Sequence, residues 1–123
     1  MVAIVAVASF GGLGAVARYQ FDGFIQNRVH GVMPLGTLTI NVTGSLMLGV
    51  LVGLNIRYGF SDTIELAAGT GFCGGFTTFS SLMYESTQLA EEGTYQRAVR
   101  FLLLSMALGG FAAAIGLLAT GAL

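Results

Sequence analysis

Charged residues are scarce in this chain. Five basic and six acidic residues are spread over 123 positions, no lysine is present, and the mean hydropathy is +0.81. A soluble domain ordinarily carries charge on about a quarter of its residues. The composition therefore excludes an ordinary soluble domain and indicates a membrane protein.

Cysteine and proline each occur once. The single cysteine, Cys73, excludes a disulfide framework and a cysteine metal cluster, and we expect it to be a small packing residue. Pro34 precedes a predicted helix, where its missing N–H is not needed. The formal net charge of −1 gives no support for a nucleic-acid partner. The sequence contains no evident pairing of a nucleophile with a base and no cluster of metal ligands, so an enzyme is not predicted.

Four long uncharged runs are present instead, at residues 1–17, 31–56, 66–84 and 101–123. Each is close to the roughly 20 residues with which a helix spans a bilayer core. Strands would need only about ten alternating residues, and an open sheet edge does not survive in hydrocarbon. The sequence therefore predicts a single all-α domain over 1–123, with four transmembrane helices and both termini on one side of the membrane.

The predicted helices cover residues 2–24, 35–56, 62–85 and 95–120. Asp62, with Glu65 three residues later, resembles a capping box at the start of the third helix. The connection between the first two helices is predicted to be a loop that contains Asn27, Arg28, His30 and Gly31. We expect no soluble domain after the fourth helix.

The basic residues give little information on orientation. None precedes Arg18, so we expect the first run to be retained and not cleaved as a signal peptide. Outside the spans, Arg28, Arg97 and Arg100 lie on one side and Arg57 on the other. Such a small difference barely fixes topology under the positive-inside rule, and it allows insertion in both orientations.

The third run contains the least regular segment, GFCGGFTTFSSLMYES at 71–86. Cys73, Gly74 and Gly75 carry small or no side chains, and hydroxyl groups follow directly at Thr77, Thr78, Ser80 and Ser81. Glycine pairs and Ser/Thr bonds to the backbone break helices. Non-helical backbone at membrane depth is tolerated only inside protein or beside water or ions. The segment predicts a break that directs backbone groups at a ligand; the alternative is a flexible but continuous, tightly packed helix.

Thr37, Asn41 and Ser45 form one polar stripe on the second helix. Asn41 either makes an interhelical hydrogen bond, worth about 0.6 kcal/mol, or lines a pore. Phe79 beside the hydroxyl groups could favour an anion through the positive edge of its ring, although packing against lipid or core is the commoner role of a membrane phenylalanine.

Two charged residues lie close to these spans. Glu85 follows Ser81 by one turn and is either part of a polar track or a charge at the helix end. Arg18 could face a partner helix, an anion route or the membrane interface, and Asp22 four residues later offers it a salt bridge. Two patterns, GxGxxA at 12–17 and GxGxxG at 69–74, match a dinucleotide fingerprint, but no soluble amphipathic helix follows them, so nucleotide binding is not expected.

Three segments together resemble the Fluc (CrcB) family of fluoride channels: GGLGAVARY at 11–19, PLGTLTIN at 34–41 with Gly44, and GFCGGFTTFS at 71–80 with Glu85. The resemblance covers nearly the whole length, and the fourth helix matches only in character. It implies an antiparallel, dual-topology dimer with two ion pathways. It also implies a structural sodium ion at the dimer centre, held by backbone carbonyl groups that correspond here to Gly74 and Thr77.

The same resemblance assigns a fluoride pathway. Fluoride is small and strongly hydrated, so a dry passage must replace its water with hydrogen-bond donors. The family usually has a second phenylalanine three residues after the first, where this chain has Leu82, which supplies bulk without a polar edge. The implied pathway residues are Arg18, Asn41, Phe79, Ser80, Ser81, Leu82 and Glu85.

The resulting expectation is a passive channel that exports fluoride across a prokaryotic plasma membrane, without ATP or a coupling ion. It would be surrounded by lipid and act as a homodimer, or as a heterodimer with a homologous subunit. One alternative is a small four-helix multidrug exporter, which relies on a glutamate in its first helix; residues 1–17 contain none. Another is an accessory membrane subunit whose glycines only pack helices.

Overall fold

The computed structural model describes residues 1–28 and 34–121, and these ranges are almost wholly helical and contain no strand. The elements in chain order are α1 (Val2–Arg28), α2 (Leu35–Tyr58), α3 (Asp62–Glu65), the π-helix η1 (Leu66–Cys73), α4 (Gly74–Phe76), α5 (Phe79–Glu91) and α6 (Tyr95–Ala119). Within the described ranges, α1, α2 and α6 are long and apolar enough to cross a membrane. The predicted all-α membrane fold with a break in its third span is confirmed.

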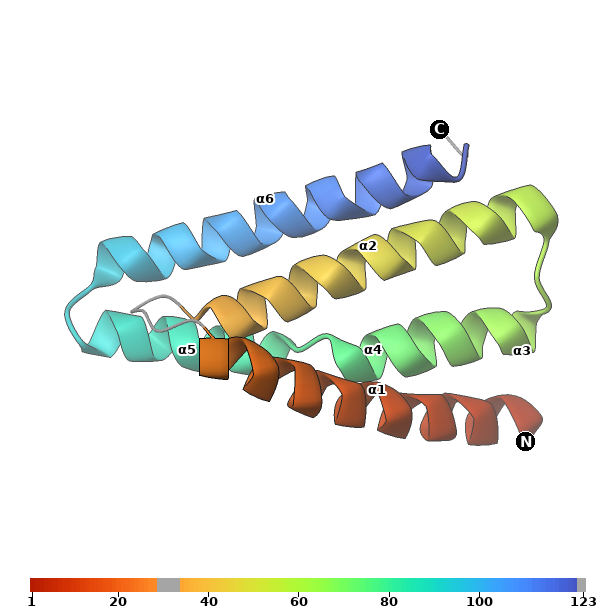
Figure 1. Cartoon of the computed structure of the whole chain (residues 1–123), viewed down its shortest axis with the longest axis horizontal. Coiled ribbons are helices and arrows are strands. Elements are labelled where there is room, and N and C mark those ends of the chain that lie inside the picture. Colours follow the sequence, from red (N-terminus) through yellow and green to blue (C-terminus); the bar gives the residue numbers. More distant parts are fainter. Residues whose placement is uncertain (29–33, 122–123) are drawn as a thin grey trace.

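The chain passes back and forth along the long axis of the molecule (Figure 1). Helices α1 and α2 run in opposite directions, the series from α3 to α5 forms the third pass, and α6 returns. The start of α1 and the end of α6 therefore lie at the same end of the bundle, as predicted. Helix α2 packs mainly against α6, whereas α1 packs mainly against η1 and α4.

Glycines allow the helix backbones to approach closely at both contacts. A Cβ atom added to Gly49 in α2 would overlap the carbonyl oxygen of Ala113 in α6. A Cβ atom added to Gly14 in α1 would likewise overlap the carbonyl oxygen of Phe72 in η1. Small residues at such positions drive helix association in a membrane, where lipid removes the hydrophobic advantage of larger side chains.

The buried core lies where α5 meets α6. Leu82, Leu89, Ala98 and Phe101 form one cluster, and Phe101 is fully buried. Most of the outer surface is apolar, including long stretches of α1 and α6. Helices that are apolar all round are typical of a membrane environment.

Three details at the helix ends differ from the sequence prediction. Helix α1 continues to Arg28, whose guanidinium lies 4.5 Å from the ring centroid of Phe24, so Asn27 and Arg28 are helical and do not form a loop. His30 and Gly31 lie outside the described residues. Helix α5 continues past Glu85 to Glu91.

The predicted capping box at the third helix is also wrong. The N-cap is Ser61, whose hydroxyl accepts a hydrogen bond from the Ile64 N–H at 3.3 Å, and Asp62 is the first helical residue. Serine and aspartate are both good caps, so the two neighbouring residues could not be separated by type. Pro34 does lie directly before α2, as predicted.

Candidate functional site

The third span is interrupted between α4 and α5. Thr77 (φ −80°, ψ 161°) and Thr78 (φ −145°, ψ 121°) are extended, and a new helix begins at Phe79. The hydroxyl of Thr78 caps that helix by accepting from the Ser81 N–H at 3.1 Å. The predicted break is therefore real, and the continuous-helix alternative is wrong.

The break redirects backbone donors away from their usual acceptors. In a continuous helix the Thr78 N–H would donate to the Gly74 carbonyl oxygen, but it donates to Asn41 Oδ1 at 2.8 Å. The Ser81 N–H would donate to the Thr77 carbonyl oxygen, but the Thr78 hydroxyl accepts it. Both carbonyl groups that the resemblance assigned to a cation have thus lost the helical donor that would have occupied them.

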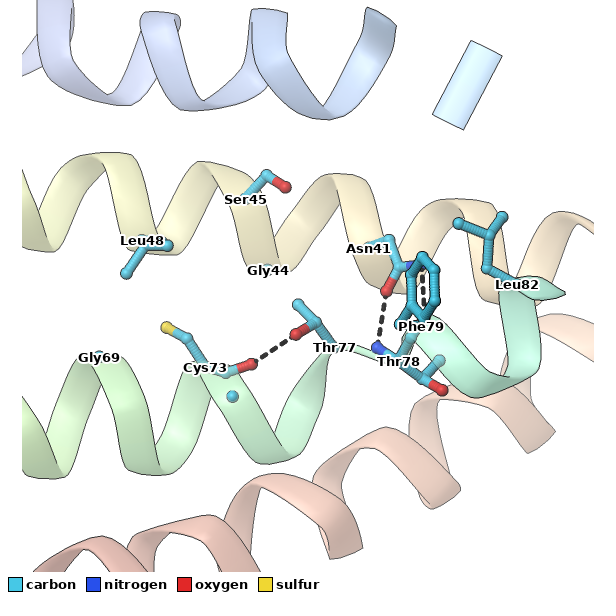
Figure 2. Close-up of a pocket in the computed structure, with 11 residues that line it drawn as sticks. Asn41, Gly44, Ser45, Leu48, Gly69, Cys73, Thr77, Thr78, Phe79 and Leu82 are labelled. Carbon is cyan, nitrogen blue, oxygen red and sulfur yellow. Dashed lines mark hydrogen bonds between the residues drawn. The ribbon is translucent and has the colours of Figure 1, made fainter. Parts of the chain in front are cut away.

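Asn41 reaches the break from α2. Its Oδ1 accepts from the Thr78 N–H, and its Nδ2 donates to the Thr78 carbonyl oxygen at 2.9 Å, so the amide holds both backbone groups of one residue. Figure 2 shows the Asn41 side chain directed at the Thr78 nitrogen, with the Phe79 ring beside it. An amide nitrogen carries two hydrogens, and this bond uses one of them. Asn41 therefore both makes the interhelical hydrogen bonds and lines the cavity.

A cavity of about 330 Å³ lies at the break, between α2 and the third span. It is lined by Asn41 and Ser45 of α2, by Cys73 of η1 and by residues of the break itself (Figure 2). Five of the residues predicted from the sequence meet here: Asn41, Gly74, Thr77, Phe79 and Leu82. The lining combines carbonyl, hydroxyl and amide groups with one aromatic ring.

The two bulky residues of the cavity differ in burial. Phe79 is 72% exposed, so its ring is not part of the core of this chain. Leu82 is only 9% exposed, because it packs in the cluster with Phe101. The position at which the family usually has a second phenylalanine is therefore filled by a residue that belongs largely to the core.

Ser80, Ser81 and Glu85 lie on α5 beyond this cavity. The Ser80 hydroxyl is 3.3 Å from the Thr78 hydroxyl. Glu85 is half-buried beside Thr37, and its Oε2 has no hydrogen-bond partner among the described residues. Because Glu85 lies inside α5, its interpretation as a charge at the helix end is wrong.

Arg18 contacts a partner helix. Its Nε donates to the Gly75 carbonyl oxygen at 3.3 Å, across the contact between α1 and α4. The alternative salt bridge to Asp22 does not form within the described part of the chain. Asp22 instead accepts at Oδ2 from Gln26 Nε2 at 3.2 Å, and its Oδ1 is buried.

Residues 5–117 match the family described as CrcB-like protein, Camphor Resistance (CrcB). The chain belongs to this family.

The CrcB-like chain also matches curated relatives over most of its length. It is 44% identical over 114 residues to fluoride-specific ion channel FluC 1 of Leifsonia xyli subsp. xyli, a match that covers 93% of this chain and 83% of the relative. It is 46% identical over 112 residues to fluoride-specific ion channel FluC 2 of Cutibacterium acnes, with 90% of each chain covered. The corresponding protein FluC of Gloeothece citriformis is 37% identical over 113 residues, covering 92% of this chain and 91% of the relative. The resemblance read from the sequence is thereby confirmed.

Two contacts of the CrcB-like site were not predicted. The hydroxyl of Thr78 is expected from the sequence to bond freed backbone groups, but no pattern pairs Thr78 with Asn41, which lies 37 positions away. Gly11, Gly14 and Arg18 lie on one face of α1 at three- and four-residue spacing, but no pattern in the sequence pairs Arg18 with Gly75, which lies 57 positions away. A glycine stripe on α1 that ends at Arg18 was the only signal for the second contact.

Proposed function

We propose that this CrcB-like chain is a fluoride-selective channel that lets fluoride leave the cell passively across a prokaryotic plasma membrane. The observation that carries the proposal is the interrupted third span, where a half-buried amide and an exposed ring line one cavity. The curated relatives are named as fluoride-specific ion channels, and an ion channel is not an enzyme. The sequence likewise did not predict an enzyme.

The polar groups of the cavity suit a small, strongly hydrated anion. The second Nδ2 hydrogen of Asn41 and the hydroxyl of Thr78 are donors that can replace water around fluoride, whereas the Thr77 hydroxyl already donates to the Cys73 carbonyl oxygen at 2.9 Å. The edge of the Phe79 ring carries partial positive charge and adds a weaker contact. With Leu82 in place of a second ring, Phe79 acts alone. Ser80 and Ser81 continue the track along α5 toward Glu85, and the guanidinium of Arg18 lies at the α1 side of the break.

The carbonyl groups of Gly74 and Thr77 suit a structural sodium ion. Hard cations prefer oxygen ligands, and both carbonyl groups have lost their helical donors to side chains. When bound, a sodium ion would supply fixed positive charge at the break. The protein's own residues hold the backbone in place whether or not the ion is present, through Asn41 and the Thr78 cap.

We infer that two copies in opposite orientations complete the channel. Phe79 and Gly74 line the cavity but are exposed in the single chain, and a second copy would cover them. The partner is an identical chain or a homologous subunit, since two of the relatives are named FluC 1 and FluC 2. No contact within the described residues favours a multidrug exporter or an accessory subunit.

Ion flux from liposomes tests the proposal directly. The purified chain is reconstituted into vesicles loaded with potassium fluoride, and efflux is recorded on adding valinomycin, with chloride-loaded vesicles as the control. Fluoride efflux without chloride efflux is expected. If well-folded protein gives no efflux, the chain is co-expressed with a homologous subunit; failure of that pair as well would overturn the channel proposal.

A further inference from the structure

We propose that Arg18 is a positioning residue that holds the helix break by donating to the Gly75 carbonyl group. The bond joins α1 to the last turn before the extended residues, with Nε 3.3 Å from the carbonyl oxygen. The inference rests on the proposed function only where it predicts fluoride flux. Its effect on the backbone of the break is measured separately.

The Gly75 carbonyl group needs a donor because the helix ends there. In a continuous helix it would accept from the Phe79 N–H, but Thr77 and Thr78 are extended and Phe79 starts the next helix. A backbone carbonyl left unpaired away from water is costly. Arg18 supplies the missing donor from a different helix.

The packing of α1 places Arg18 at this carbonyl. A Cβ atom on Gly75 would overlap the carbonyl oxygen of Gly11, and one on Gly14 would overlap that of Phe72. The backbones of α1 and the third span are therefore in direct contact one and two turns before Arg18. The side chain of Arg18 is half-buried, and its planar guanidinium presents Nε in a fixed direction.

Arg18 and Asn41 contact the break from two different neighbouring helices. Asn41 of α2 fixes both backbone groups of Thr78, and Arg18 of α1 occupies the carbonyl of Gly75. Four carbonyl groups before α5 lose the helical donor that a continuous helix would give them, those of Gly74, Gly75, Phe76 and Thr77. Arg18 satisfies the carbonyl group of Gly75.

Hydrogen exchange of Arg18→Met measures this role. Methionine keeps much of the length of the side chain and removes the donor. We expect the amides of residues 77–81 to exchange at least about tenfold faster than in the wild type, because a hydrogen bond from a charged donor is lost at the break. We also expect the fluoride efflux rate to fall by at least about tenfold as the pathway residues lose their fixed positions. Arg18→Lys, which keeps a charged donor without the planar fork, should restore part of both properties.

Arg57→Met is the matched control. Arg57 Nη1 also donates to a backbone carbonyl oxygen, that of Thr120 at 3.0 Å, but at the far end of α2 and α6. The same substitution there removes the same charge and the same kind of bond. It should speed exchange only near the end of α6 and leave exchange at residues 77–81 as in the wild type.

Two results would overturn the proposal. Unchanged exchange at 77–81 in Arg18→Met means that the bond does not hold the break. A loss of efflux that is equal in Arg18→Met and Arg18→Lys, with unchanged exchange, means that Arg18 acts on the ion itself. If Arg18→Met does not fold, Arg18→Leu, which also lacks a donor, replaces it, and exchange at 77–81 equal to that of the wild type overturns the proposal. If the wild type carries no fluoride, the exchange experiment still decides the role of Arg18, and only the proposed function fails.

Discussion

At the scale of single residues, Asn41 combines two roles that the sequence could only offer as alternatives. One amide oxygen and one amide hydrogen hold Thr78, and the second hydrogen remains for a ligand in the cavity. The bond to the break therefore also orients the remaining donor.

Replacing Asn41 by aspartate removes both amide hydrogens and keeps an oxygen acceptor. The carboxylate still accepts from the Thr78 N–H, but it donates nothing and repels an anion. We expect fluoride efflux to fall by at least about tenfold, because a hydrogen bond to a charged ion is worth about 1.5–3 kcal/mol. The thermal midpoint should also fall, since the Thr78 carbonyl loses its donor. Thr43→Val on the same helix is the control, and efflux equal to wild type in Asn41→Asp would exclude Asn41 from the pathway.

Because Phe79 is exposed and Leu82 is buried, we expect Phe79→Leu and Leu82→Phe to differ in their effect on stability. Phe79→Leu changes a residue that is exposed in the single chain, so the stability of the single-chain fold should change by no more than about 0.5 kcal/mol while fluoride efflux falls. Leu82→Phe adds a ring to the cluster around Phe101 and should lower stability by about 1–3 kcal/mol. Denaturation midpoints and efflux rates of both variants check this pair. A gain of flux in Leu82→Phe at wild-type stability would show that the ring enters the cavity.

The residue types at the site were predictable, whereas their pairing was not. Small, hydroxyl-bearing and amide residues at the break mark freed backbone, and that much follows from local chemistry. The bonds from Asn41 to Thr78 and from Arg18 to Gly75 depend on how α1 and α2 pack on the third span. That packing is set by contacts between distant segments, so no local pattern specifies the partner.

At the scale of helices, the contact between α1 and the third span depends on positions without a side chain. A Cβ atom on Gly14 would meet the backbone of Phe72, whereas one on Gly12 meets nothing within 4 Å. We expect Gly14→Ala to lower stability by about 1–3 kcal/mol, because rigid backbone must move. Gly12→Ala is the control and should be neutral or stabilising by up to about 1 kcal/mol. Equal melting temperatures of the two variants in detergent would contradict the close contact.

The location of the helices was predictable from the sequence, whereas their internal geometry and their exact first residues were not. Uncharged runs of bilayer length located the spans, since length and polarity are set by the membrane. The π-helical turns of η1 were not predicted, because hydropathy and residue type locate a helix without fixing its hydrogen-bond register. The N-cap at Ser61 was missed because Asp62 is an equally good cap by type.

At the scale of the whole molecule, the two ends of the bundle differ only slightly in the number of basic residues outside the spans. Arg28, Arg97 and Arg100 lie toward the end of the bundle opposite the termini, and Arg57 lies at the other end. If the channel is a dual-topology dimer, as we propose, a stronger charge difference should trap each chain in one orientation and prevent its assembly.

Two charge variants test this expectation. Glu91→Lys with Glu92→Lys strengthens the existing difference, whereas Asp62→Lys and Glu65→Lys with Arg97→Gln and Arg100→Gln reverses it. These six side chains are all exposed. We expect each variant alone to give cells little resistance to fluoride and the two together to restore it. Full resistance from either variant alone would contradict an antiparallel dimer.

The wide turns of η1 have a consequence for insertions and deletions. A π-helical turn contains about one residue more than an α-helical turn, so η1 holds a surplus that an ordinary helix lacks. Removing one residue from α6 would rotate everything beyond it by about 100°. Removing one residue from η1 could instead convert a wide turn to an ordinary one, with the break still facing α1 and α2. We therefore expect single-residue differences in length between related chains to be tolerated at 66–73 and selected against in α6.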